Sequence, residues 1–163
     1  MGKAQTLSQL NRPVAYNSST NVTTIRSGAS DTTAITVDAS QNVLVTAPSS
    51  LGYGTGAGGA VTQLTSKTTA VTLNKPTGQI TTNNSNIASA GTATFQVNNT
   101  LVAATDLVIV TILNTSISSP SNYRTDVVSV FAGGFFVRLT NTSAGNLSEA
   151  AVVNFAVIKG VNA

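Results

Sequence analysis

Several of the side chains on which enzymes and metal sites most often depend are missing from this 163-residue chain. It contains no cysteine, no histidine and no tryptophan. Without cysteine it can form no disulfide, and without cysteine and histidine it lacks the ligands of most zinc sites. Serine or cysteine nucleophiles activated by an imidazole are excluded too. These absences remove the commonest hydrolase mechanisms before any motif is considered.

Charge is also scarce, and it is not clustered. Charged residues are 8% of the chain, the formal net charge is +3, and the eight lysines and arginines are scattered singly. Nucleic-acid-binding proteins instead gather basic residues into a patch or stripe. The longest strongly apolar run, residues 107–113, is far shorter than the roughly 20 residues that a bilayer requires. The N-terminal segment has no apolar stretch typical of a secretory signal. We therefore expect no nucleic acid and no membrane among the partners.

Small polar and β-branched residues are abundant instead. Threonine, serine and asparagine, with 26, 18 and 16 residues, make up more than a third of the chain, and valine and isoleucine add 19 and 8. β-Branched residues favour strands, and low charge combined with many aliphatic residues argues against disorder. No segment shows a sustained helical period. The composition predicts a folded all-β protein.

The first 50 residues are expected to form an attachment segment rather than a domain with its own core. Residues 1–32 are polar, contain Pro13 and lack sustained periodicity, which predicts an extended arm that orders only against a partner. Residues 34–38 and 42–46 have the pattern of two strands joined by residues 39–41, which predicts a short β-hairpin. Because two strands alone are marginal in water, this hairpin also needs a neighbour to pack on.

A glycine-rich linker at residues 51–60 precedes a regular β pattern over residues 61–163. Residues 75–78 (KPTG) have proline at the second turn position, and Gly133-Gly134 lies between two β-rich runs. Eight short strands separated by such turns predict an eight-stranded antiparallel sandwich that is jelly-roll-like in its connections. The strands are expected near residues 61–64, 69–74, 79–82, 92–97, 106–113, 124–131, 135–141 and 150–159.

Two of the expected strands, residues 107–113 and 150–158, are apolar on both faces. In a two-sheet sandwich only one face of each strand meets the core, so the other face requires a further covering layer. A second copy of the chain is the favoured cover, and the alternative is that the N-terminal arm folds back over the same sheet. The expected contact residues of a homo-oligomer are Val108, Val110, Ile112, Val152 and Ile158.

Two short motifs match catalytic or cofactor sites but lack the context that such chemistry requires. Residues 54–59 match G-x-G-x-x-G. A strand-like segment follows them instead of a helix, and no acidic residue stands about 20 positions further on, so we interpret them as a joint. Ser66-Lys67 lies at an expected turn, where nothing indicates the buried lysine of lowered pKa that a nucleophilic pair would need.

The remaining polar residues do not indicate a substrate site. The acidic residues are far apart in the sequence and are expected to be solvated, and the few aromatic residues lie mostly in apolar runs. A glycan of the host surface is therefore a partner that the composition disfavours. We predict no enzymatic activity, no cofactor and no metal. The acidic residues are Asp31, Asp38, Asp106, Asp126 and Glu149.

Part of the chain is similar to a known family. Residues 51–63 (LGYGTGAGGAVTQ), followed by 65–75 (TSKTTAVTLNK) and 78–81 (GQIT), resemble a domain of small structural proteins of tailed bacteriophages and prophages. Residues 141–150 and 153–160 are similar to the close of that domain, and residues 33–47 resemble the short β repeats of phage fibre stalks. The resemblance covers about residues 51–160. It implies a virion protein that is usually trimeric, and it supplies no catalytic residues.

Within a virion, a chain of this length suits a capsid decoration (cement) protein on the outer capsid surface. A short head or tail fibre that contacts the host surface is the alternative. We expect residues 1–50 to bind the major capsid protein and the chains to associate as a homotrimer. The expected attachment residues are Ile25, Ile35, Val37, Val43 and Val45 as apolar anchors, and Arg12 and Arg26 as partners of coat-protein carboxylates.

Overall fold

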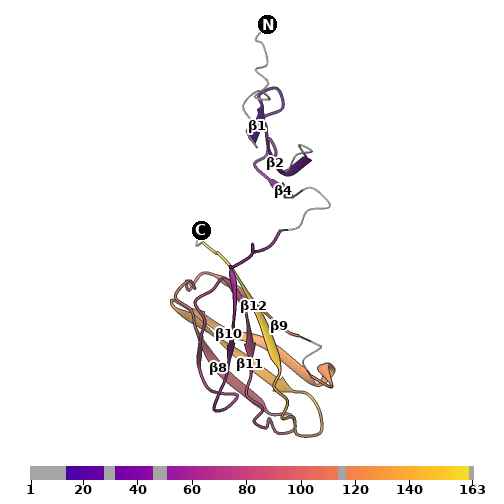
Figure 1. Cartoon of the computed structure of the whole chain (residues 1–163), viewed down its shortest axis with the longest axis vertical. Helices are drawn as coiled ribbons and strands as arrows, with labels where there is room; N and C mark the ends of the chain where they lie inside the picture. Colours follow the sequence, from indigo (N-terminus) through magenta and orange to yellow (C-terminus); the bar gives the residue numbers. More distant parts are fainter. Residues whose placement is uncertain (1–13, 28–31, 46–50, 114–116, 162–163) are drawn as a thin grey trace. The chain divides into compact units, whose positions relative to one another are not determined.

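In the computed structural model, which describes residues 14–27, 32–45, 51–113 and 117–161, the chain forms two compact units. Unit 1 ends at Gly52 and unit 2 begins at Tyr53. Apart from one short 3₁₀ helix, η3 (Pro120–Asn122), every regular element of the described residues is a β-strand (Figure 1). The prediction of an all-β protein is confirmed.

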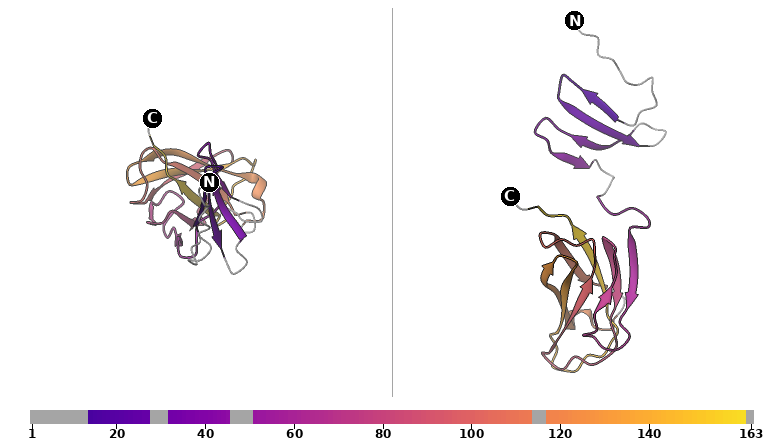
Figure 2. Two further views of the ribbon diagram at one scale, coloured as in Figure 1. Left: turned by 90° about the horizontal axis from the view of Figure 1, so that it is seen from above. Right: turned by 90° about the vertical axis from the view of Figure 1, so that its left-hand side faces the viewer.

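Unit 1 is a four-stranded antiparallel sheet in the order β1-β2-β3-β4. Figure 2 shows its strands side by side in one layer. Strands β3 and β4 confirm the predicted hairpin, but β1 and β2 lie in the predicted arm, so that expectation is wrong for residues 14–27. These two strands are short, with four and six residues, and the pairing of β2 with β3 supports them. The strands are β1 (Val14–Asn17), β2 (Val22–Ser27), β3 (Thr32–Val37) and β4 (Val43–Val45).

Hydrogen bonds between near neighbours in the sequence shape the turns of unit 1. At the β3–β4 turn, one carboxylate oxygen of Asp38 accepts from the backbone N–H groups of Ser40 and Asn42, both at 2.9 Å. At the β1–β2 turn, the side-chain oxygen of Asn17 accepts from the backbone N–H of Ser19 at 3.0 Å. Such local contacts are the reason that Asp and Asn are frequent in turns. The pairing of these strands is thus encoded within one chain.

Unit 2 contains two four-stranded sheets, in the orders β5-β7-β12-β9 and β10-β11-β8-β6. Each of the eight strand segments predicted from the sequence overlaps an observed strand. The first sheet consists of β5 (Gly58–Thr62), β7 (Thr77–Thr81), β12 (Val152–Ile158) and β9 (Leu107–Ile112). The second consists of β10 (Tyr123–Phe131), β11 (Gly134–Asn141), β8 (Thr92–Asn98) and β6 (Val71–Thr72).

The two sheets are not wholly antiparallel. β5 pairs with β7 in parallel, and so does β6 with β8, so the predicted antiparallel order is wrong for these pairs. β5 begins at Gly58, within the predicted linker. A Cβ atom at Gly78 on β7 would lie 2.8 Å from the carbonyl oxygen of Gly59 and 2.6 Å from Leu73 Cδ2. The glycines of β5 and β7 therefore belong to a close strand contact, which the linker interpretation missed.

Side chains from both sheets of unit 2 form one hydrophobic core, so the arrangement is β-sandwich-like. The rings of Phe135 on β11 and Phe155 on β12 meet across it, with centroids 5.4 Å apart. The inward-facing side chains of the strands supply most of the core, and loop residues complete it. The fully buried aliphatic members on the strands are Ile80, Val97, Val137, Leu139 and Val153.

The inner face of β9 is the one that was expected to contact another copy. Val108 is buried in the core, and Val110 and Ile112 pack against it. The prediction of an oligomer contact is wrong for these three residues. Val152 and Ile158 do lie on the outer side of β12, opposite the buried residues of that strand. Because both faces of β9 are apolar, its sequence could not indicate which face is inward; the pairing with β12 decides it.

Replacing Ile112 by aspartate should therefore destabilise unit 2 itself. Ile112 is half-buried and packs against the core, so the carboxylate would lie partly desolvated against apolar side chains. This should cost about 1–3 kcal/mol, against a total stability of about 5–15 kcal/mol for a typical domain. Ile109→Asp is the matched control, since Ile109 is an exposed residue of the same strand. We expect it to change the free energy of unfolding by no more than about 0.5 kcal/mol. Urea denaturation measures both variants, and an unchanged midpoint for Ile112→Asp would contradict the assigned core face.

Candidate functional site

The strand register of unit 1 places its apolar side chains on one face of the sheet. Direct partners across antiparallel strands point to the same side, and alternate residues of a strand share a face. Val14 pairs with Ile25, Ile25 with Ile35, and Ile35 with Val45. We term this surface the N-terminal apolar face, and its members are Val14, Tyr16, Thr23, Ile25, Ile35, Val37, Val43 and Val45.

None of these eight side chains is buried. Val43 is 67% exposed and Tyr16 58% exposed; Val14 and Ile25 are exposed too, and the other four are half-buried. The described part of unit 1 is a single layer of strands and has no second layer of its own over this face (Figure 2). Burying one valine or isoleucine side chain stabilises a protein by roughly 1.5–3 kcal/mol. Burial of these side chains by a partner would therefore contribute strongly to the free energy of association.

The opposite face of the same sheet is more polar. Thr24 pairs with Thr36, and Thr36 with Leu44, while Asn17 lies at the end of β1 next to Tyr16 on the other side. Among the described side chains of this face, Leu44 is the most exposed apolar one. The N-terminal apolar face, in contrast, carries no charged side chain at any of its eight positions. The sheet of unit 1 is amphipathic, and its apolar side is the surface suited to protein contact.

The five apolar residues predicted to anchor the protein all lie on this one face. They are Ile25, Ile35, Val37, Val43 and Val45, and their role in attachment stays a prediction. Val14 and Tyr16 belong to the same face and were missed, although they alternate as a strand does. Arg12 lies outside the described residues, and Arg26 is described only as a backbone position of β2.

Unit 2 has a second uncharged surface, on the outer side of the β5-β7-β12-β9 sheet. The four strands of this sheet contain no charged residue. Ile158 pairs with Leu107, and both are exposed, as is Ile109 on the same side of β9. The other sheet instead carries an exposed ion pair between Asp126 and Arg138, 2.6 Å apart. The two outer sides of unit 2 therefore differ in charge.

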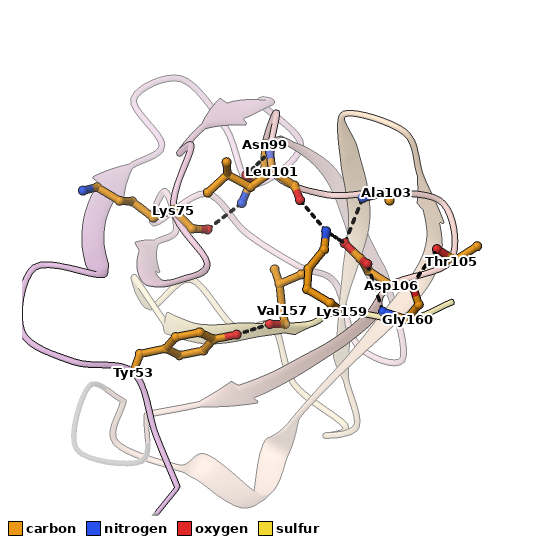
Figure 3. A network of polar contacts seen from close by, with 10 residues as sticks. All are labelled: Tyr53, Lys75, Asn99, Leu101, Ala103, Thr105, Asp106, Val157, Lys159 and Gly160. Carbon is orange, nitrogen blue, oxygen red and sulfur yellow. Dashed lines mark hydrogen bonds and ion pairs between the residues drawn. The ribbon is translucent and has the colours of Figure 1, made fainter. Parts of the chain in front are cut away.

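A buried carboxylate fastens the end of β12 to the loop before β9 (Figure 3). The Asp106 side chain accepts from Lys159 Nζ at 2.5 Å, from the Ala103 backbone N–H at 2.8 Å and from the Gly160 backbone N–H at 3.1 Å. Lys159 Nζ also donates to the Leu101 carbonyl oxygen at 2.8 Å. These hydrogen bonds, led by that from Ala103, lower the pKa of Asp106. We term this group the Asp106 clasp.

Tyr53, the first residue of unit 2, is hydrogen-bonded near the C-terminal end of β12. The Tyr53 hydroxyl donates to the carbonyl oxygen of Val157 (Figure 3). Asn99 continues the network, since its amide nitrogen donates to the Lys75 carbonyl oxygen at 2.7 Å and its side-chain oxygen accepts from the Leu101 N–H at 3.0 Å. The point at which the chain enters unit 2 is thus tied to the final strand. This arrangement is structural, because each polar atom named is engaged by the chain itself.

Lys67 is buried, which corrects the expectation of a lysine without burial. Its ammonium group donates to the carbonyl oxygens of Asn83 and of Glu149, the latter at 2.8 Å. Loss of hydration lowers the pKa of Lys67, and the negative charge of Glu149 opposes this shift. The Ser66 hydroxyl is bonded to that of Thr69 at 3.1 Å instead. Lys67 therefore joins three chain segments, and Ser66 is not its partner.

Four of the acidic residues accept hydrogen bonds within their own unit, and the expectation of a solvated carboxylate is wrong for Asp106, whose side chain is buried. Asp38 caps a turn of unit 1, Asp106 forms the clasp, and Asp126 pairs with Arg138. The Glu149 carboxylate accepts from the Ser118 backbone N–H at 2.7 Å, which lowers its pKa. The fifth, Asp31, lies outside the described residues.

Residues 54–57 lead into β5, which begins at Gly58, and not into the helix that a dinucleotide loop requires. The interpretation of residues 54–59 as a joint does not hold for Gly58 and Gly59, which belong to the strand. In the parts of the chain that the structure describes, no group of three or more acidic, histidine or cysteine side chains is placed to hold a metal ion. The same described parts include no helix with the length and apolar character needed to cross a membrane. No family model, no curated protein and no solved structure matches the chain.

Replacing Asp106 by asparagine should lower the stability of unit 2 in a pH-dependent way. Because folding lowers the pKa of Asp106, its contribution is fully present above the unfolded value of about 3.9 and is lost as the pH falls through the folded value. The difference in urea midpoint between wild type and Asp106→Asn should therefore be largest at neutral pH and should shrink in acid. Asp126→Asn, in an exposed pair, is the control and should have little effect at any pH. A difference in urea midpoint that does not change with pH would contradict a stabilising role of the ionised Asp106 carboxylate.

Proposed function

We propose that this protein is a non-enzymatic structural protein of a tailed-bacteriophage virion. In this proposal it is a homotrimeric capsid decoration (cement) protein on the outer capsid surface, bound to the major capsid protein through residues 1–50. The observation that carries the proposal is the contrast between the two units. Unit 2 encloses a hydrophobic core, whereas the sheet of unit 1 has an apolar face and none of its described side chains is buried. A large exposed apolar surface is typical of a protein contact site.

The polar groups of unit 2 support a structural role. Lys67, Asp106 and Glu149 carry groups of a kind that can serve catalysis, and each is engaged with backbone groups of its own unit. The β-sandwich-like unit would then be an independently folded domain that projects from the capsid. Its jelly-roll-like connectivity stays a prediction, as does the trimer. The uncharged outer side with Leu107, Ile109 and Ile158 is a surface through which copies of unit 2 could meet.

A short head or tail fibre is the second candidate. It is favoured by the antiparallel pairing of β3 with β4, which lie mostly within the segment 33–47 that resembles stalk repeats of phage fibres. The copy number in the virion separates the two functions. A decoration protein covers the whole capsid in many copies, whereas a fibre is present in a few copies at one place. Quantitative mass spectrometry of purified virions, normalised to the major capsid protein, measures this number.

Deleting residues 1–52 should abolish binding to undecorated capsids and leave unit 2 folded. The truncated chain keeps all residues of the core, so its far-UV circular dichroism should retain the β spectrum and a cooperative thermal transition. In a sedimentation assay the full chain should pellet with capsids, and the truncated chain should stay in the supernatant. Undiminished binding of the truncated chain would show that unit 2 makes the attachment, which would reverse the proposed roles of the two units.

A further inference from the structure

We infer that the N-terminal apolar face is covered by the same surface of further copies of this chain, before any capsid is bound. This inference rests on the proposed homo-oligomer and deepens it, because it assigns the self-contact to a surface of unit 1. The sequence alone instead predicts self-contact through β9 and β12, and contact with the coat protein through the apolar residues of unit 1.

The first argument is that the sheet is encoded within one chain. Its three strand pairs connect neighbours in the sequence, and the Asp38 and Asn17 side chains stabilise two of its turns. Formation of this sheet therefore needs no strand from a capsid. Once it forms, seven apolar side chains share one exposed side, and such a surface promotes association in a free protein. Another copy of the chain is the partner that is always present.

The second argument concerns charge. In a symmetric contact between copies, residues near the symmetry axis meet their own counterparts, so a charged residue there would face the same charge and destabilise the contact. None of the eight positions is charged. The polar groups among them are Thr23 and the Tyr16 hydroxyl, and Tyr16 already donates to the Asn21 side chain within its own hairpin at 3.0 Å. The face can therefore be covered by a copy of itself without burying an unpaired charge.

This self-contact still leaves unit 1 with surfaces for a coat protein. β1 and β4 are the edge strands of the sheet, and an edge strand can pair with a strand of another protein. The more polar side with Thr24, Thr36 and Leu44 also remains outside the contact between copies. Capsid attachment and self-association would then use different parts of the same unit.

The reactivity of single introduced cysteines distinguishes a covered face from a free one. The chain has no cysteine of its own, so Val43→Cys and Leu44→Cys each provide one thiol, on adjacent residues of β4 that point to opposite sides. In the single chain Val43 is the more exposed, 67% against 50% for Leu44. The full-length variants are kept reduced and reacted with a maleimide, without capsids, at a concentration where light scattering shows the wild-type oligomer.

If copies cover the face, Val43→Cys should react at least about tenfold more slowly than Leu44→Cys, because its reaction then requires opening of the contact. On dilution to the monomer the protection should disappear. Val43→Cys reacting as fast as or faster than Leu44→Cys would overturn the inference. So would protection that persists in the monomer, because the cover would then come from within the same chain.

Two further results separate this inference from the proposed function. A free, reactive Val43→Cys that becomes protected only when undecorated capsids are added would overturn the self-contact and leave the decoration function standing. A wild-type protein that is monomeric by light scattering would overturn both the self-contact and the proposed trimer. Protection in the oligomer, combined with a failure to bind capsids, would support the self-contact and contradict the decoration function.

Discussion

An apolar face of a β-sheet is stable only when another layer covers it, because a single sheet cannot bury either of its own sides. Unit 2 meets this requirement internally. Its two sheets contribute to one core in which Phe135 and Phe155 meet. The described sheet of unit 1 consists of one layer and leaves its apolar side chains exposed or half-buried. The difference between the units supports both the proposed contact role of unit 1 and its proposed self-association.

Polar contacts fix both ends of the chain within unit 2. Asp106 holds Lys159 and Gly160 at the end of β12, and the Tyr53 hydroxyl is bonded to the Val157 carbonyl of the same strand (Figure 3). Both the entry of the chain into unit 2 and the end of its last strand are therefore fixed. Lys67 adds a buried connection between its own turn and the carbonyl oxygens of Asn83 and Glu149. Such a unit could be presented on a surface without depending on it for folding.

Local patterns were sufficient to predict much of the fold. Alternating residues and turn signals located the eight strands of unit 2, and the hairpin formed by β3 and β4 was recognised from its connection. Features that depend on distant partners were missed. The parallel pairing of β5 with β7 requires close approach at Gly78, and burial of Lys67 requires acceptors 16 and 82 positions away. The sequence contains no local signal for either.

The candidate site shows the same limit. Five apolar residues of the N-terminal apolar face were recognised, but only strand register showed that they share one side. The face of β9 was assigned wrongly because both of its sides are apolar, and its pairing with β12 is set by the whole sheet. β1 and β2 were missed because strands of four and six residues are too short to show a sustained period, and the consecutive threonines of β2 interrupt its alternation.

Amide hydrogen exchange, followed strand by strand at two protein concentrations, tests most directly whether unit 1 depends on association. In the oligomer we expect slow exchange in β1 to β4 as well as in the central strands β8, β11 and β12. On dilution to the monomer, β1 to β4 should exchange rapidly, while the core strands of unit 2 should keep their protection because their stability comes from within one chain. Protection of β1 to β4 that is the same in monomer and oligomer would contradict the claim that other copies stabilise unit 1.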